Sequence, residues 1–330
     1  MRLPSFEYLE PKTLAEACSL LKQKDTKLIA GGTELLVKMK QKLLTPKTLV
    51  NIKKIANLNY ISYKHDEGLE IGAASTLHSI ANSPVVRERF SILAQAAVGV
   101  GKPRIPYMAT IGGNICLDSR CFYHNQSHLW KPRLACYKDG GDVCYVVKGG
   151  NRCHALFMAD TVPAMIALGA KVQISGLDGE KQSALEELYT GKGEKPNSLK
   201  PGQILTKIQV TSPPPHTGGF YLKYSLREAI DFAIVGVGVV ITLKSEDGAC
   251  SDARIVLGSV GMSPVRAVKA EEALRGGEID DKLVEIAAQV ALKEVHPVTH
   301  MGIPASYKRK IVQTLTKQAI RQAWQKAKSA

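Results

Sequence analysis

The first part of the chain alternates between segments of helical and of strand periodicity. Apolar residues recur every three or four positions in residues 14–23 and 33–41, which predicts two amphipathic helices. Short apolar runs at residues 27–32, 48–52 and 68–76 predict strands. Thr33 is the expected N-cap of the second helix. We therefore predict an α/β unit at the start of the chain.

The pattern changes further along the chain. Residues 159–175 predict a helix, a glycine stop and a strand. Breaks rich in glycine and proline follow at residues 176–181 and 191–202, and the strongest break, at residues 211–219, is the expected domain boundary.

Beyond that boundary the chain returns to strands and then to helices. Residues 232–243 and 253–262 are rich in β-branched residues and predict strands, and residues 280–295 predict a helix. The last segment, residues 307–330, predicts a helix whose apolar face holds Ile311, Val312, Leu315 and Ala319.

Length and composition set the class of protein. A chain of 330 residues is expected to fold as two or three domains. It contains no apolar run of the roughly 18 to 20 residues that a membrane span needs. The first residues lack a basic-then-apolar signal pattern, so a cytoplasmic location is expected. Thiols stay reduced there, which favours metal or redox chemistry for clustered cysteines.

The net charge of +14 predicts attraction to something acidic. Nucleic acid, a membrane face, an acidic protein and an anionic cofactor all fit that charge. Residues 307–330 carry seven basic residues and no acidic one, which is typical of a terminal helix with a solvated basic face. No nucleic-acid motif accompanies them, so we expect no nucleic-acid binding.

Two glycine turns point to a bound diphosphate. Gly31 and Gly32 separate a predicted strand from a predicted helix, and "ATIGGN" repeats the arrangement at Gly112 and Gly113. Glycine lets a backbone approach a ligand closely, and free N–H groups there favour an anion. Neither turn is a Walker A loop or a GxGxxG fingerprint. Two such turns together predict a phosphate-bearing cofactor.

Five of the seven cysteines lie in residues 116–153. Four thiolates in one loop can ligate a cluster or a metal ion. Their long spacing, without a CxxC pair, argues against a zinc finger and is compatible with a cubane iron–sulfur cluster. Zinc and unligated thiols remain alternatives. Cys18 and Cys250 are expected to be structural, and Cys116 to be a small buried side chain.

The motifs "AGGTELL", "ATIGGN", "ADTVPAMIALGA" and "LKYSLREAIDFAIVGVGV" resemble those of the FAD-binding medium subunits of molybdenum hydroxylases, such as xanthine and carbon monoxide dehydrogenases. The resemblance covers nearly the whole chain. It implies an α+β fold: a vanillyl-alcohol-oxidase-type (PCMH-type) FAD-binding domain and a smaller α+β C-terminal domain with a three-stranded sheet and helices.

The same resemblance divides the chain into domains. The FAD-binding domain would span residues 1–215, with subdomains at about residues 1–55 and 56–215 and an inserted iron–sulfur loop at residues 116–157. A C-terminal domain of the carbon monoxide dehydrogenase flavoprotein type would span residues 216–330.

The motifs also imply which residues contact FAD. This chain has Glu34 where many relatives have aspartate. No catalytic residue is expected on this chain. The implied contacts, in chain order, are Ala30, Gly31, Gly32, Thr33, Glu34, Leu35, Thr76, Val100, Gly101, Thr110, Gly113, Asn114, Asp160, Leu205 and Lys223.

The cysteine loop is similar to an insertion in the β subunit of 4-hydroxybenzoyl-CoA reductase, which carries an extra [4Fe–4S] cluster. By motif, the cluster ligands are Cys121, Cys136, Cys144 and Cys153. His124, His128 and His154 lie in the same loop as less favoured ligands.

That resemblance also implies partners. They are a large molybdopterin subunit and a small [2Fe–2S] subunit in a heterotrimer that pairs into a dimer, with ferredoxin as electron donor. In that branch, electrons from ferredoxin drive reductive dehydroxylation to benzoyl-CoA. The alternatives are a hydroxylase subunit that passes electrons outward to NAD or another acceptor and, more distantly, a zinc-stapled basic binding module without flavin.

Overall fold

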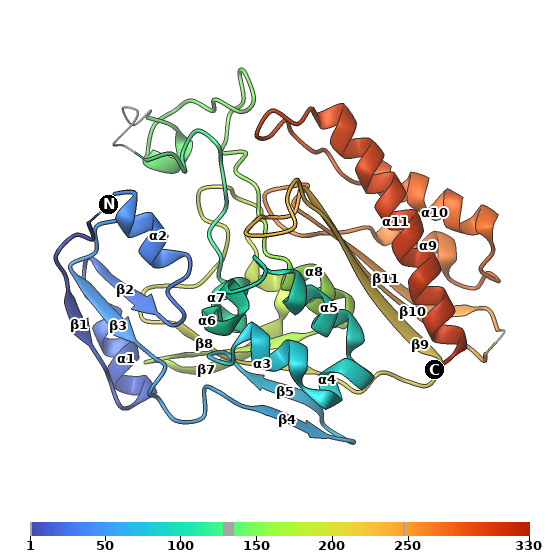
Figure 1. Cartoon of the computed structure of the whole chain (residues 1–330), viewed down its shortest axis with the longest axis horizontal. Helices are drawn as coiled ribbons and strands as arrows, with labels where there is room; N and C mark the ends of the chain where they lie inside the picture. Colours follow the sequence, from blue (N-terminus) through green and yellow to red (C-terminus); the bar gives the residue numbers. More distant parts are fainter. Residues whose placement is uncertain (1, 128–134, 247) are drawn as a thin grey trace.

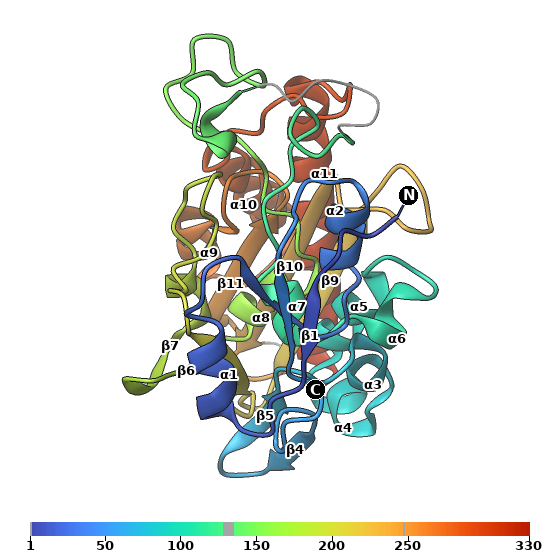
Figure 2. The ribbon, with the colours of Figure 1, turned by 90° about the vertical axis from the view of Figure 1, so that its left-hand side faces the viewer.

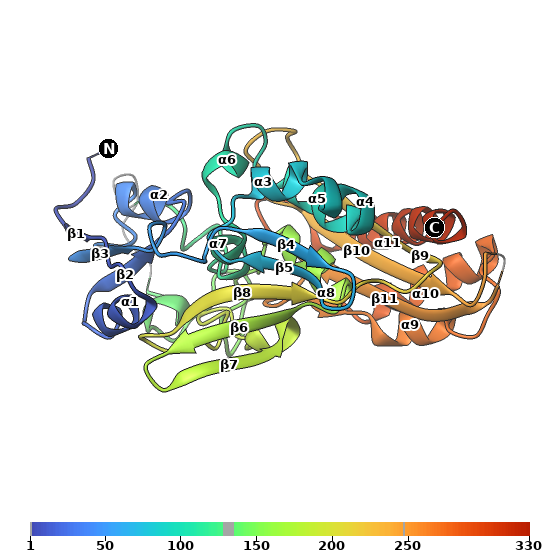
Figure 3. The same ribbon diagram turned by 90° about the horizontal axis from the view of Figure 1, so that it is seen from below.

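The structure is a computed structural model that describes residues 2–127, 135–246 and 248–330. Within these residues the strands form three sheets, each with its own helices. Seen from below, the three units follow one another along the longest axis of the molecule (Figure 3).

The first unit is a small parallel sheet with the strand order β1-β3-β2. Its strands pair in parallel because helices connect them, as in any crossover connection. Its elements are β1 (Glu7–Leu9), α1 (Leu14–Leu20), β2 (Thr26–Ile29), α2 (Leu35–Lys40) and β3 (Thr48–Asn51).

The middle unit is an antiparallel sheet with the order β4-β5-β8-β6-β7. Helices lie above this sheet in Figure 1. The strands are β4 (Ile61–Lys64), β5 (Gly68–Gly72), β6 (Lys171–Gly176), β7 (Gly179–Ala184) and β8 (Ile204–Val210). The helices are α3 (Leu77–Asn82), α4 (Pro84–Arg89), α5 (Ser91–Gly99), α6 (Ile105–Met108), α7 (Ile111–Ile115), α8 (Thr161–Ala167) and the short 3₁₀ turns η1 (Tyr137–Asp139) and η2 (Leu185–Leu188).

The third unit is an antiparallel sheet with the order β12-β11-β10-β9. The helix α11 packs on β9 and β10, and α5 and α8 pack on the same sheet from the middle unit. Its elements are β9 (Thr217–Tyr224), β10 (Val235–Leu243), β11 (Cys250–Gly258), β12 (Val265–Arg266), α9 (Val268–Leu274), α10 (Asp281–Lys293) and α11 (Ala305–Lys328).

Each helix and strand predicted from the sequence has a counterpart in the structure, although some bounds differ, as for β5, which ends at Gly72, and β11, which covers Cys250–Gly258. Two further expectations are wrong. Thr33 is not the N-cap of α2: the helix begins at Leu35 after Glu34, and no side chain caps it. The Glu34 carboxylate is held by Arg120 and Lys38 instead. The C-terminal sheet has a short fourth strand, β12, beside the three long ones.

The basic terminal segment forms α11 and buries Ile311, Val312 and Ala319 on one face, as its pattern predicts. One of its basic residues, Lys308, is also buried and donates a hydrogen bond to the Ser259 carbonyl. None of the described helices is long and apolar enough to span a membrane.

The cysteine loop, residues 116–157, leaves the middle unit between α7 and α8. Its described residues, 116–127 and 135–157, extend above α2 in Figure 1 and project on the same side after a quarter turn in Figure 2. The loop therefore lies near the first unit although the two are far apart in sequence.

Candidate functional site

The first glycine turn connects β2 to α2 and covers residues 30–35. Gly32 adopts a φ of 72°, which a side chain with a Cβ rarely tolerates. A Cβ on Gly31 would lie 1.9 Å from the carbonyl oxygen of Met108. Gly31 therefore lets this turn contact the segment that leads into the second glycine turn.

The backbone of the first turn has free hydrogen-bond donors. No described residue accepts a hydrogen bond from the N–H groups of Gly31, Gly32, Thr33 or Glu34. Consecutive unpaired N–H groups in a turn suit an anion such as a diphosphate. The turn thus fits the diphosphate of FAD, and we name residues 30–35 the flavin turn.

The second glycine turn lies beside the start of α3. Thr76 and Thr110 are paired across an antiparallel bridge, and each caps the helix that follows it. The Thr110 hydroxyl accepts from the Gly113 N–H at 3.1 Å. Gly113 is exposed, and of the atoms that the structure describes a Cβ there would meet only that hydroxyl within 4 Å. The face of this turn is therefore open to a ligand.

Asn114 has a different role from the rest of the second turn. Its side-chain oxygen accepts from the Thr161 backbone N–H at 3.2 Å and from the Thr161 hydroxyl at 2.7 Å. Both residues are buried. Asn114 therefore connects the second turn to α8, directly next to Asp160.

Asp160 is held in a buried network. Tyr221 donates to one carboxylate oxygen at 3.0 Å, and the Lys223 ammonium donates to the other at 2.9 Å. Burial raises the pKa of Asp160, and the nearby Lys223 charge opposes that rise. Lys223 also donates to the carbonyl of Gly99 at 2.9 Å, next to Val100 and Gly101. The structure thus brings these predicted cofactor residues together.

We expect Asp160→Asn to destabilise the fold more than it weakens cofactor binding. The change leaves the Lys223 ammonium without its carboxylate in a buried site, which costs about 3 kcal/mol. Tyr221→Phe removes one hydrogen bond from the same network and should cost about 1 kcal/mol. Denaturant unfolding of both variants checks this, and equal stability of Asp160→Asn and wild type would contradict it.

Leu205 lies on β8 opposite Ile174, and its side chain is buried in the core of the middle unit. Its contact with FAD stays a prediction, as do the other cofactor contacts that the motifs imply.

The four predicted cluster ligands surround one small cavity. Cys121, Cys136, Cys144 and Cys153 all line it. Burial raises the pKa of Cys121 and raises that of Cys153 to about 11, and neighbouring thiols add to both shifts. Cys116 lies outside the cavity and packs against the core of the middle unit, as a structural cysteine would.

The surroundings of the cavity suit a thiolate-bound cluster. The side chain of Asn125 accepts from the backbone N–H of Cys121 at 2.7 Å. Its amide nitrogen is buried, and no described residue accepts from it. A donor of this kind can serve the sulfur atoms of a cluster.

One observation keeps the zinc alternative open. The ligand atoms of His124, Cys136 and Asp139 lie within 4.8 Å of one another. That nitrogen, sulfur and oxygen set suits zinc. However, His124 and Asp139 already share a hydrogen bond of 3.0 Å. His154 lines the cavity, and His128 falls outside the described residues.

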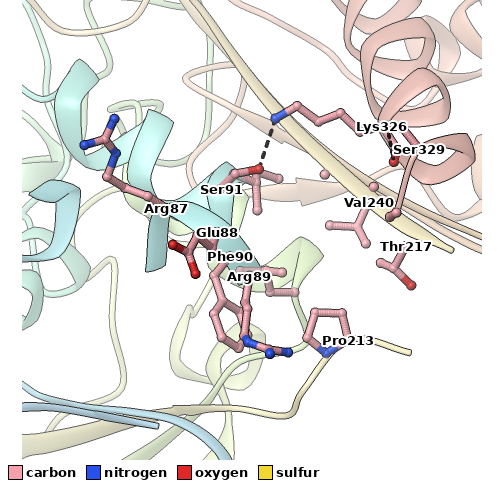
Figure 4. Close-up of a pocket in the computed structure, with 15 residues that line it drawn as sticks. Arg87, Glu88, Arg89, Phe90, Ser91, Pro213, Thr217, Val240, Lys326 and Ser329 are labelled. Atoms are coloured by element: carbon pink, nitrogen blue, oxygen red, sulfur yellow. Dashed lines mark hydrogen bonds between the residues drawn. The ribbon is translucent and has the colours of Figure 1, made fainter. Parts of the chain in front are cut away.

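A separate cavity of about 360 Å³ lies between the middle unit and the end of α11 (Figure 4). Lys326 donates to the Ser91 hydroxyl there at 3.0 Å. Among the described residues, none of the flavin turn, the second turn or the cysteine loop lines this cavity. It is therefore not the predicted cofactor site.

Two protein families match successive parts of the chain, which together make up most of its length. Residues 4–213 match the FAD binding domain in molybdopterin dehydrogenase, and residues 220–323 match the CO dehydrogenase flavoprotein C-terminal domain. The break between the two matches, residues 214–219, covers the end of the linker between β8 and β9 and the first residues of β9.

Known proteins of the same kind match this chain over nearly their whole length. The chain is 28% identical to the nicotinate dehydrogenase FAD-subunit of Eubacterium barkeri, over 96% of this chain and 95% of that protein. It is 29% identical to the carbon monoxide dehydrogenase medium chain of Afipia carboxidovorans, over 98% and 99%. It superposes on a solved carbon monoxide dehydrogenase from Hydrogenophaga pseudoflava with a TM-score of 0.81 at 27% identity, over 98% and 99% of the two chains.

Proposed function

Because the chain belongs to the FAD-binding medium subunits of the molybdenum hydroxylase family, we propose that it is an electron-transfer subunit carrying a [4Fe–4S] cluster beside its FAD. The observation that carries the proposal is the cysteine cavity. Four cysteines, spread over more than thirty positions of one loop, converge on a single small cavity in the inserted segment. Four thiolates are a complete ligand set for such a cluster.

Different segments of this chain would bind the FAD and the cluster. The flavin turn offers backbone N–H groups to the diphosphate, and the second turn leaves an open glycine face beside it. The cysteine cavity lies in the loop that projects above α2. When bound, FAD exchanges electrons singly or in pairs and the cluster exchanges them singly, so together they can connect a one-electron carrier to a partner subunit.

The proposed partner subunits are those that membership of this family implies. We propose a heterotrimer with a large molybdopterin subunit and a small [2Fe–2S] subunit, which pairs into a dimer of heterotrimers. Substrate would bind on the large subunit. The extra cluster favours a reductase like 4-hydroxybenzoyl-CoA reductase, which receives electrons from ferredoxin and converts its substrate to benzoyl-CoA.

The surface of the cysteine loop supports contact with another protein. Phe122, Tyr123, Val143 and Tyr145 are all exposed there. The Phe122 and Tyr123 rings lie 5.7 Å apart and those of Tyr123 and Tyr145 lie 5.8 Å apart. Exposed aromatic groups of this kind are enriched at protein interfaces.

We expect the intact complex to accept electrons from reduced ferredoxin in a salt-dependent reaction. The chain carries a net charge of +14, and ferredoxin is acidic, so their encounter is electrostatically favoured. The second-order rate should fall at least about fivefold between roughly 50 mM and 500 mM salt. Stopped-flow reduction of the complex measures it.

The control for this reaction is the Cys136→Ser complex, which should keep FAD but lose rapid reduction by ferredoxin. Reduction of that complex at the wild-type rate would instead favour a hydroxylase subunit that passes electrons outward to NAD or another acceptor. A colourless preparation containing zinc would favour the zinc-stapled module.

A further inference from the structure

A network of charged side chains connects the cysteine loop to the flavin turn. Arg120 donates to both carboxylate oxygens of Glu34, at 2.8 and 2.9 Å. The Lys38 ammonium bridges Glu34 at 3.0 Å and Asp118 at 2.7 Å. The Lys138 ammonium reaches the other oxygen of Asp118 at 2.8 Å. We call these five residues the ionic clasp.

The side chains of the two lysines of the ionic clasp are buried, while Glu34, Arg120 and Asp118 are partly exposed. The side chains of Lys38 and Lys138 are each 5% exposed. Burial acts to raise the pKa of Asp118, but the charges of Lys38 and Lys138 outweigh it and lower that pKa. A buried salt bridge adds little net stability compared with apolar side chains of similar size. Removing one partner, however, leaves the other charge buried and uncompensated. Losing a single member of the clasp is therefore costly in free energy.

One end of the clasp is part of the flavin turn itself. Glu34 precedes α2 and is one of the residues whose backbone N–H groups are free for a diphosphate. Its side chain cannot turn toward the ligand, because Arg120 and Lys38 hold it. The guanidinium of Arg120 also lies 4.6 Å from the centre of the Phe232 ring, in the C-terminal unit.

The other end of the clasp reaches the cysteine cavity. Arg120 pairs with Leu156 through two backbone hydrogen bonds, of 2.7 and 2.8 Å, which close the neck of the loop. Lys138 donates to the Ser119 hydroxyl at 2.7 Å and to the Gly193 carbonyl at 3.0 Å. A Cβ on Gly193 would lie 2.8 Å from the sulfur of Cys153, so Gly193 lies directly beside that thiol.

We propose that the ionic clasp couples the two cofactor sites, with Arg120 and Lys138 as positioning residues that orient the flavin turn and the cysteine cavity together. The inference rests on the proposed function for the identity of the two ligands. It gives a reason for the longer carboxylate at Glu34, which reaches Arg120 and Lys38 at once. Coupling of this kind is reciprocal, so loss of one ligand weakens the other by the same factor.

The test compares FAD affinity with and without iron in the full-length chain, purified without oxygen. The FAD dissociation constant is measured by flavin fluorescence before and after removal of iron with a chelator. The variants are Arg120→Met and Lys138→Met, which replace the two basic residues that the cysteine loop contributes to the clasp. The matched control is Arg321→Met, which breaks an Arg321–Asp281 ion pair of 2.6 Å between α11 and α10.

We expect iron removal to weaken FAD binding about tenfold in the wild type and in Arg321→Met. In Arg120→Met and Lys138→Met, FAD binding should already be weaker by about that factor with iron present. Iron removal should then change it less than about twofold. Wild-type FAD affinity and a wild-type response to iron in both clasp variants would overturn the proposal.

Two results separate this inference from the proposed function. Wild-type protein that binds FAD but contains no iron would reject the cluster, and the clasp is then judged by FAD affinity alone. A loss of at least about fivefold in both clasp variants, relative to Arg321→Met, would still support positioning of the flavin turn. If Arg120→Met does not fold, Glu34→Asp takes its place, because the shorter side chain withdraws the carboxylate from Arg120 and Lys38. Unchanged FAD affinity in Glu34→Asp and Lys138→Met would then overturn the proposal.

Discussion

Gly32→Val should yield folded protein without flavin. Gly32 has a φ of 72°, a conformation that costs a β-branched residue about 1–2 kcal/mol, so the flavin turn must rearrange. The new Cβ would also lie 3.0 Å from Leu36 in α2. Rearrangement misdirects the free N–H groups of the turn. Loss of two hydrogen bonds to a charged diphosphate costs about 3 kcal/mol or more, a factor of at least about one hundred in FAD affinity.

Gly276→Val is the matched control for this prediction. Gly276 has a φ of 79° and lies after α9 in the C-terminal unit, where an added Cβ would meet no atom of the described residues within 4 Å. The control therefore imposes the same backbone strain away from the flavin turn. Flavin absorbance of the purified variants measures the outcome. Full flavin content in Gly32→Val would remove the diphosphate from this turn.

Serine at any one of Cys121, Cys136, Cys144 or Cys153 should abolish iron binding. A [4Fe–4S] cluster needs a thiolate at each iron, and no further described cysteine lines the cavity to replace a lost one. Iron content should fall from about four atoms per chain toward zero, and visible absorbance of the cluster should disappear. FAD should remain bound when supplied in excess.

Cys116→Ser is the matched control, because Cys116 lies in the same segment but packs against the core of the middle unit. It should keep its iron. Full iron retention in all four single variants of the cavity would reject the ligand assignment, and loss of iron in Cys116→Ser alone would move the site to the second glycine turn.

The fold was predictable from the sequence where local pattern decides structure. The glycine stop at Gly169, between α8 and β6, and the apolar face of α11 follow from short-range periodicity, and both occur in the structure. The helix start at α2 was not predictable in this way. A threonine before an amphipathic segment usually caps it, but here no side chain caps α2. Glu34, the residue before the helix, instead forms an ion pair with a residue 86 positions away.

The candidate site was predictable only in part for the same reason. Motifs indicated Asp160 and Lys223 separately, and the structure shows them as partners with Tyr221, which no motif indicated. Arg120 and Lys138 have no sequence signature, because a charged residue in a loop is usually solvated. Their proposed positioning role depends on which elements the fold brings beside them. It is inferred from the arrangement of the loop over α2 (Figure 1).

The iron and flavin content of the natively purified protein tests the central claim most directly. Metal analysis and flavin extraction on the same sample give the ratio of iron to FAD per copy of this chain. We expect about four iron atoms and one FAD, together with the electron paramagnetic resonance signal of a reduced [4Fe–4S] cluster. One FAD without iron, or zinc in the place of iron, would contradict the claim that the cysteine loop holds an electron-transfer cluster.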